Sequence, residues 1–218
     1  MKLLCVSDHV DPLVYTATIK ERFSDIDLVL AAGDLPLSYY GFIVSSLNRP
    51  LLFVFGNHEL AELSRYRHSR GLHPVSFKDD YSAPSFGSIH IGGRVKRIKG
   101  IIIAGLGGCP VYNRGPNQFS ELSMALRILR LVPRLVLNRI FFGRHLDVFL
   151  THAPPYCIND RADQCHRGFK AFIWFVRRFK PRYMVHGHVH LYDRNAPRSS
   201  RFCDTEIVNA YDHTVLEL

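Results

Sequence analysis

Short runs of apolar residues alternate with stretches of mixed polarity along the first part of the chain. The apolar runs at residues 3–6, 28–32 and 51–55 predict buried strands, and residues 13–23 and 38–47 predict helices between them. Continuous apolar runs separated by helical patterns are typical of parallel strands that are covered on both faces. This part of the chain therefore predicts an α/β arrangement around a central sheet.

The remainder of the chain has a less regular pattern. Residues 71–105 are rich in Gly, Ser and Pro, and their short strand-like segments indicate an antiparallel or mixed section. A helix is expected from residue 118 to 131, continuing to 142 with a break near Pro133, because proline removes a helical hydrogen bond. The later elements are expected to be strands at 147–150 and 182–185, a helix at 169–179, and two closing strands within 202–218.

Length and composition agree with one folded domain. The chain has 218 residues, of which 47% are hydrophobic, with 15 Phe and 10 Tyr. This content supplies a core and excludes an intrinsically disordered chain. Because the sequence contains no repeat, low-complexity tract or linker, we expect a single domain spanning residues 1–218, of the α/β class, with central mixed β-sheets flanked by helices.

Polar residues follow directly after the predicted strands. In open α/β sheets, ligands bind beyond the carboxyl ends of the strands. The residues in these positions, in chain order, are Asp8, Asp34, Asn57, His152, His188 and His190. We therefore expect them to gather at one edge of the sheet.

The side chains at this edge share a chemistry. Carboxylate oxygen, amide oxygen and imidazole nitrogen suit divalent ions such as Mn, Fe or Zn. Asp34 has two oxygens and can bridge two ions, an arrangement used repeatedly for phosphoryl hydrolysis. Taken singly, Asp8 or Asp34 would more often cap a helix, and Gly56-Asn57 would more often form a turn. Their joint occurrence in order favours a metal site.

The sequence around these residues resembles the calcineurin-like metallophosphoesterase family. The pattern of that family is DxH, GDxx, GNHD or GNHE, a lone His, and GHxH. The matching residues here are Asp8, Gly33-Asp34, Gly56-Asn57-His58-Glu59, His152 and Gly187-His188-Val189-His190. The resemblance implies a four-layer α+β/α fold with the metal site at the carboxyl ends of the strands. It also implies a hydrolase of phosphoester bonds, either a phosphodiesterase or a phosphatase.

Carried over residue by residue, the resemblance implies two divalent metal ions, with Mn expected and Fe or Zn as alternatives. The first metal would be bound by Asp8, Asp34 and His190, and the second by Asp34, Asn57, His152 and His188. His58 would be the catalytic group that donates to the leaving oxygen or to a phosphoryl oxygen, with a metal-bound hydroxide as nucleophile. Glu59 would either orient His58 or cap a helix.

One position departs from the family pattern. Val10 stands where DxH has its ligand histidine, so the first metal loses one nitrogen ligand. Asp11 or His9 could replace it, water could fill the position, or the first site could be weak. We rank Asp11 above His9, because His9 should point away from the side of the chain that Asp8 occupies.

Two loops hold candidates for substrate binding. Arg114 follows a glycine-rich turn and precedes a helix, a setting in which an arginine can approach a phosphate. His166 and Arg167 lie in an irregular segment after His152, which should pass near the metals. A plain loop with a helix cap is the alternative interpretation of the first segment, and a capped turn that of the second.

The formal net charge of +9 favours anionic partners, either a phosphorylated small molecule or nucleotide, or nucleic acid. A metal-dependent nuclease is therefore one alternative, with a stripe at Arg127, Arg130, Arg134, Arg139 and Arg144. The other is a non-catalytic binding protein that keeps this fold, for which Val10 is the main support and against which His58 counts.

Cysteine content and hydropathy bear on location. The five cysteines are odd in number and form no CxxC pair, which favours a reducing compartment over a disulfide framework. No stretch of about 18 apolar residues is present, so we expect no stable membrane insertion. Without a targeting signal, a cytoplasmic location is expected. The sequence does not indicate the oligomeric state.

Overall fold

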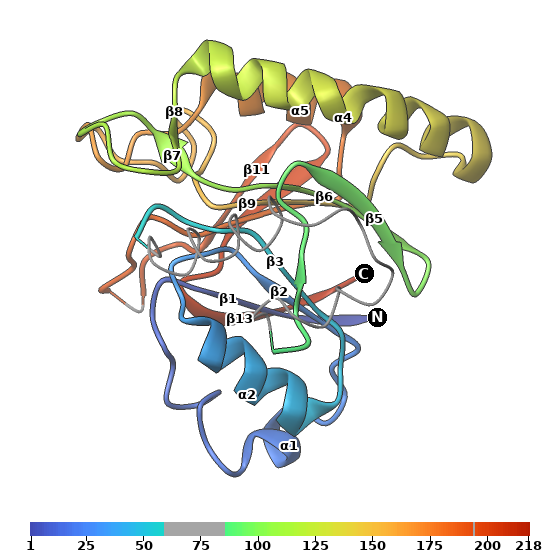
Figure 1. Cartoon of the computed structure of the whole chain (residues 1–218), viewed down its shortest axis with the longest axis vertical. Helices are drawn as coiled ribbons and strands as arrows, with labels where there is room; N and C mark the ends of the chain where they lie inside the picture. Colours follow the sequence, from blue (N-terminus) through green and yellow to red (C-terminus); the bar gives the residue numbers. More distant parts are fainter. Residues whose placement is uncertain (59–85, 194) are drawn as a thin grey trace, which may run out of the picture.

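The computed structural model describes residues 1–58, 86–193 and 195–218, and it contains two stacked β-sheets (Figure 1). The first sheet has the order β13-β1-β2-β3-β4. Its strands are β1 (Lys2–Ser7), β2 (Leu28–Ala31), β3 (Leu51–Phe53), β4 (Ile89–His90) and β13 (Asp212–Glu217). Strands β1 to β4 are parallel, and β13 pairs antiparallel with β1.

The second sheet has the order β11-β12-β10-β9-β6-β5. Its strands are β5 (Arg94–Ile98), β6 (Ile101–Leu106), β9 (Val148–Thr151), β10 (Tyr183–His186), β11 (Ser199–Phe202) and β12 (Thr205–Asn209). The four inner strands are parallel, and β5 and β11 form antiparallel edges. A small pair, β7 (Cys109–Pro110) and β8 (Gln118–Phe119), lies outside both sheets.

Helices cover the outer faces of both sheets, as the sequence resemblance implied. Helices α1 (Ile19–Arg22) and α2 (Leu37–Leu47) pack against the first sheet, and α4 (Glu121–Phe142) and α5 (Lys170–Phe179) against the second (Figure 1). A third apolar cluster lies between the sheets, with Leu30, Val54 and Leu150 fully buried. The order helix, sheet, sheet, helix confirms the predicted mixed α/β class with sheets flanked by helices.

Some predicted elements differ from the observed ones. The helix expected at 13–23 is only α1, because residues 11–18 form successive turns instead. Helix α4 begins after Ser120, whose side chain accepts a hydrogen bond from Ser123 N, and it continues through Pro133 without a break. Pro133 is exposed, so the carbonyl it leaves unbonded faces solvent rather than the core. The two closing strands predicted within 202–218 are observed as β12 and β13, and one further strand, β11, precedes them.

Among the described residues, no helix is both long enough and apolar enough to cross a lipid bilayer. All five cysteines are free thiols.

Candidate metal centre

The predicted ligands come from the carboxyl ends of five strands, and both sheets contribute. Asp8 follows β1, Asp34 follows β2 and Asn57 follows β3, whereas His152 follows β9 and the histidine pair follows β10. Ligand atoms of Asp8, Asp34 and His152 lie within 4.8 Å of one another. The backbone turns sharply at these ends, since Asp8, Asp34 and His188 adopt left-handed φ values of 63°, 56° and 69°. Such strain is found preferentially at functional sites.

Glycines allow the strand ends to approach one another closely. A Cβ on Gly56 would lie 2.0 Å from Asp34 Oδ1, and one on Gly187 would lie 2.4 Å from Asp8 Oδ2. Gly33 has a φ of +99°, and a Cβ there would lie 2.5 Å from Gly56 N. The glycines of the three motifs are therefore needed for close contact between the carboxylates and the neighbouring backbone.

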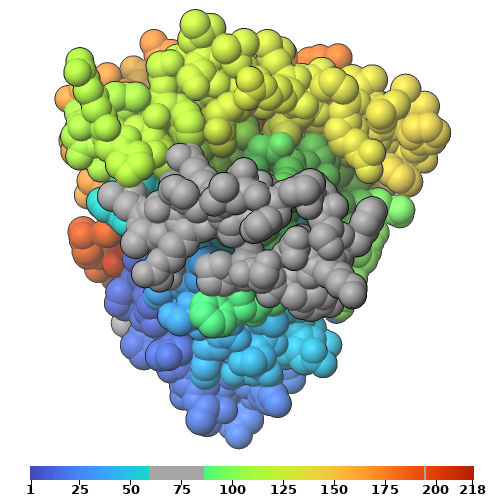
Figure 2. All heavy atoms as spheres, in the orientation of Figure 1, coloured from blue at the N-terminus to red at the C-terminus, as the bar shows by residue number. Residues whose placement is uncertain are grey.

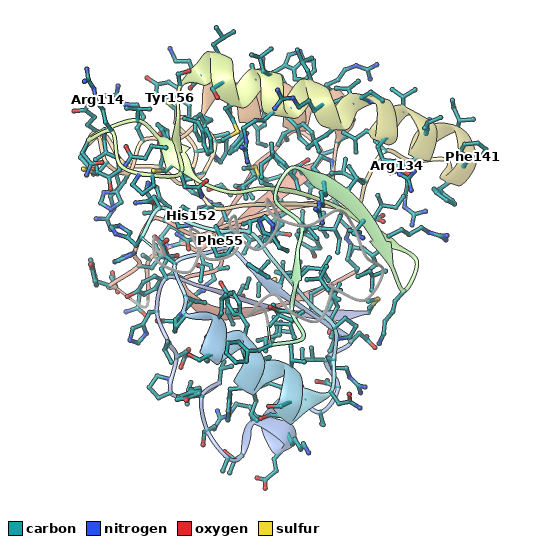
Figure 3. The ribbon with its side chains drawn as sticks, viewed as in Figure 1. Phe55, Arg114, Arg134, Phe141, His152 and Tyr156 are labelled. Carbon is teal, nitrogen blue, oxygen red and sulfur yellow. The ribbon has the colours of Figure 1, made fainter. Side chains whose placement is uncertain are left out.

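His152 is fully buried between the two sheets and has a fixed ring orientation. Its Nδ1 donates to Ala32 O over 2.8 Å, which ties β9 to β2. Its Nε2 then faces Asn57 Oδ1 at 3.0 Å and Asp34 Oδ2 at 3.3 Å (Figure 3 labels His152 at mid-height on the left). A carbonyl partner on one imidazole nitrogen is the usual way in which a protein orients the other towards a metal.

His188 bridges the sheets in a similar way. Its backbone N–H donates to both carboxylate oxygens of Asp8 at 3.0 Å, joining β10 to β1. Its Nε2 donates to Cys165 O at 2.7 Å. Burial lowers the pKa of His188 to about 3, and the adjacent His152 adds to this effect. His188 is therefore a neutral imidazole with one nitrogen lone pair to offer.

The buried carboxylates of Asp8 and Asp34 lie close together, so a positive charge between them would be stabilising. Burial raises the pKa of Asp8, and the Asp34 carboxylate adds to this, while His152 opposes it. Burial also acts to raise the pKa of Asp34, but the His152 imidazole outweighs it and holds that pKa well below its usual range. Burial lowers the pKa of His152, yet the charge of Asp34 prevails and raises it to about 9. Among the described residues, no lysine or arginine forms an ion pair with either carboxylate. The donor set therefore fits a divalent cation.

Asn57 presents its amide oxygen to this cluster because of a tyrosine that the sequence analysis did not identify. Asn57 Nδ2 donates to Tyr112 Oη over 3.1 Å, which turns Oδ1 towards His152. Tyr112 lies in the turn between β7 and β8. No sequence signal marked it, because its contact with Asn57 spans 55 positions of the chain.

The residues predicted to bind the first metal are less closely gathered. The Nε2 atom of His190 lies 4.0 Å from Asp8 Oδ1, and its side chain is 39% exposed. Its Nδ1 contacts Tyr192 Oη at 2.9 Å. Val10, in the slot of the family histidine, packs against the core beneath α1 and α2.

Neither suggested replacement for that histidine reaches Asp8. Asp11 uses one carboxylate oxygen to accept from Leu13 N and the other to contact His213 Nδ1. His9 is exposed and its Nδ1 pairs with Asp212 at 2.7 Å. Our ranking of Asp11 above His9 therefore has no support, because strand β13 holds both side chains away from the cluster.

His58 lies at the rim of the cluster. Its backbone N–H donates to Asp34 Oδ1 over 2.9 Å, and its imidazole is near enough to help lower the pKa of Asp34. The residue is exposed. Glu59, for which we weighed orienting and capping roles, lies outside the described residues.

The structure separates the three predicted substrate-binding residues. The ring of His166 lies 5.5 Å from that of His188 and 6.5 Å from that of His190, so His166 borders the cluster. Its Nδ1 contacts Asp163 Oδ1 at 2.8 Å. Arg114 is exposed at the tip of the β7–β8 turn, away from His152 (Figure 3). Arg167 lines a separate hollow of about 320 Å³ with Tyr156.

Arg161, in the loop after His152, was not among the residues predicted from the sequence. Arg161 Nη2 donates to His190 O over 2.6 Å, and Arg161 N donates to His166 O over 3.2 Å. The loop from 155 to 169 is thus fastened to the GHxH turn. The sequence placed this loop near the metals but gave no reason to choose Arg161 over Arg167.

Comparison with known proteins gives a family and a fold. The profile of the calcineurin-like phosphoesterase family matches residues 1–192. The crystal structure of TT1561 of Thermus thermophilus aligns with a TM-score of 0.64 at 13% identity, over 97% of this chain and 89% of that one. A second crystal structure aligns with a TM-score of 0.66 at 12% identity, over 99% and 94%.

A Vps29 mutant from Entamoeba histolytica aligns less well, with a TM-score of 0.43 at 12% identity over 100% of this chain and 86% of that one. No curated protein gave a significant sequence match. At these identities the solved structures show the fold alone, whereas the family profile covers most of the chain. This chain belongs to the calcineurin-like phosphoesterase family.

Proposed function

We propose that the protein is a metal-dependent hydrolase of an exposed phosphomonoester or phosphodiester. The observation that carries this proposal is the buried cluster of Asp8, Asp34 and His152, which has two carboxylates and no lysine or arginine partner among the described residues. Membership in the calcineurin-like phosphoesterase family supports metal-dependent hydrolysis of phosphoesters, and the cluster is the proposed site of that reaction.

We define two metal positions by their proposed ligands. The inner position consists of Asp34, Asn57, His152 and His188, and the outer position consists of Asp8, Asp34 and His190. When bound there, divalent ions would polarise the phosphoryl oxygens and lower the pKa of a water molecule. Oxygen and nitrogen donors without thiolate suit Mn, with Fe or Zn as alternatives.

The positions differ in how well the protein prepares them. His152 and His188 are fixed by carbonyl partners and Asn57 by Tyr112, so the inner position needs little rearrangement. The outer position has an exposed histidine and lacks the ligand that Val10 replaces. We therefore expect the inner position to bind its ion tightly and the outer position to bind weakly.

His58 is the proposed proton donor. Asp34 anchors its backbone while the exposed imidazole can face a substrate held at the cluster. An imidazole suits proton transfer to a leaving oxygen near neutral pH. His166, which borders the cluster, is the best supported of our substrate-binding predictions, and Arg161 is added to them.

Hydrolysis of p-nitrophenyl phosphate and of bis-p-nitrophenyl phosphate by metal-stripped protein tests this function. Mn, Fe, Zn and Mg would be restored in turn, and His58→Ala would be compared with His9→Ala, since His9 is an exposed histidine that pairs with Asp212. We expect metal-restored turnover that falls by about a hundredfold in His58→Ala and stays within about twofold in His9→Ala. No turnover with any metal by folded protein would contradict the proposal and favour the non-catalytic alternative.

The nuclease alternative predicts loss of oligonucleotide cleavage when the arginines of α4 are removed. It has less support, because Arg134 borders a hollow at the start of β6, whereas the end of β6 lies beside Thr151 and His152.

A further inference from the structure

Helix α4 has two apolar faces, and only one of them meets the core. Met124, Ile128, Leu131 and Leu135 are buried against the second sheet and α5. The opposite side carries a stripe at spacings of three and four residues. We call it the outer stripe, and it consists of Leu122, Leu126, Leu129, Pro133, Val136, Leu137 and Ile140.

The outer stripe is open to solvent. Leu122 is 72% exposed, Leu129 is 54% exposed and Ile140 is 68% exposed, and Phe141 at the end of the helix is 72% exposed. Figure 2 shows α4, in lime to yellow, along the upper part of this face of the molecule. A continuous exposed stripe of this length marks an interaction surface, since single exposed leucines are common but aligned ones are not.

The flanks of the stripe are basic. Residues 122–146 contain no Asp or Glu, and they contain Arg127, Arg130, Arg134, Arg139 and Arg144. Arg144 pairs with Asp147, and Arg127 stacks on Phe119. Among the described residues, Arg130 and Arg134 form no hydrogen bond or ion pair, so their charges are available to an external partner.

A basic hollow adjoins this flank. It has a volume of about 450 Å³, lies between α4 and the β5–β6 hairpin, and is lined by Lys96, Arg97, Lys99, Arg134 and Phe142 among others. No acidic residue is among its described lining residues. Figure 3 shows Arg134 on the side of α4 that faces β5. The hollow is large enough for a phosphate-bearing headgroup.

We propose that α4 is an interfacial helix that lays its outer stripe into the surface of an anionic lipid bilayer, with headgroup phosphates bound by Arg130, Arg134 and the basic hollow. An apolar stripe beside arginines, on a helix too polar to span a bilayer, is the pattern of helices that lie in the interface plane. This surface is separate from the metal centre and does not depend on the proposed hydrolysis.

The charges around the outer stripe favour an anionic lipid surface over a second copy of this chain or a nucleic acid. A second copy packed along the stripe would bring Arg130 and Arg134 of both chains together without a carboxylate to offset them. A nucleic acid would match the arginines but would leave the row of exposed leucines against phosphates. An anionic bilayer matches both the charge and the apolar stripe.

Co-sedimentation with lipid vesicles tests the proposal. Full-length protein would be mixed with vesicles of phosphatidylcholine alone or of phosphatidylcholine with phosphatidylglycerol. We expect binding to the anionic vesicles, loss of that binding in the double variant Leu129→Glu, Ile140→Glu, and retention in the control variant Val215→Glu, whose valine is 41% exposed on β13. Circular dichroism would show that each variant is folded.

A second pair of variants tests the charged component. Arg130→Gln with Arg134→Gln should weaken binding by about 25-fold, about fivefold for each arginine, whereas Lys20→Gln with Arg22→Gln on α1 should change it little. Added salt should weaken binding as well.

Three results would overturn the proposal. The first is no binding to anionic vesicles, or equal binding to neutral ones. The second is a dimer in sedimentation velocity that Leu129→Glu dissociates, which would assign the stripe to a second copy. The third is tight oligonucleotide binding that is lost with Arg130 and Arg134 while vesicle binding persists, which would assign the arginines to nucleic acid.

Discussion

The proposed inner and outer metal positions share Asp34, but the structure orients their proposed ligands to different degrees. At the inner position, His152 is fully buried, His188 is nearly so, and each ring nitrogen that faces away from the cluster has a backbone carbonyl partner. At the outer position, His190 is 39% exposed and is oriented by Tyr192, itself on the surface. The chain next to Asp8 turns away, since His9 and Asp11 pair with residues of β13.

We infer from this difference that a chain can keep most residues of the family motif without orienting the ligands of both proposed metal positions equally well. Replacement of one histidine by Val10 gives the local chain an apolar anchor in the core beneath α1 and α2. The neighbouring polar residues then find partners on β13 instead of on a metal. Tight binding at one position and weak binding at the other is the expected consequence.

The largest effect should come from the residue that the two positions share. Asp34→Asn keeps the shape of the side chain but removes the charge that both ions need. We expect turnover to fall by about a thousandfold or more, because several kcal/mol of metal-derived stabilisation would be lost. Steady-state assays with saturating metal would measure this, and a loss below about tenfold would contradict a shared bridging role.

The two histidine substitutions separate the positions. His152→Ala should abolish tight metal binding, whereas His190→Ala should leave the tight ion in place and weaken only the second one. Metal content after dialysis would distinguish the variants. Equal loss of tightly bound metal in both would show that the positions are not independent in the way proposed.

Restoring the family histidine should sharpen the comparison. Val10→His is expected to tighten metal binding at the outer position by about tenfold, with Val10→Gln as a control of similar bulk and no imidazole. Titration of stripped protein with Mn would measure both. If Val10→His left the weak site unchanged, the weakness would have to come from the exposure of His190 rather than from the missing ligand.

The smallest effects concern the tyrosines that orient the ligands. Tyr112→Phe removes the acceptor that turns the Asn57 amide, and it should weaken the inner position by about tenfold. Tyr192→Phe is the matched change beside His190 and should leave the inner position unaltered. Equal effects of the two substitutions on tight binding would mean that Tyr112 does not orient Asn57.

The sequence predicted that Asp8, Asp34 and His152 would gather at the strand ends, because each strand end is marked by an apolar run and by the polar residue that follows it. Their role as metal ligands stays a prediction. The sequence could not predict where Asp11 points, since its partner His213 lies 202 positions away. Tyr112 and Arg161 were missed for the same reason. Tyr112 contacts Asn57 and Arg161 contacts His190, and each pair is too far apart in the sequence for a local pattern to indicate the contact.

The fold, too, was predicted well in some segments and poorly in others. The parallel strands β1, β2 and β3 were predicted close to their observed bounds, because a buried strand needs every position apolar. The stretch before α1 has helical periodicity but forms turns held by Asp11. Helix α4 has apolar residues on opposite faces, so periodicity alone could not tell which face meets the core.

The most direct test of the account is isothermal titration of metal-stripped protein with Mn at constant pH. We expect one tight equivalent of Mn and a second that binds about a hundredfold more weakly, because only the proposed inner position has all its ligands oriented. Two equivalents of equal affinity would contradict it and would mean that another group completes the outer position despite Val10.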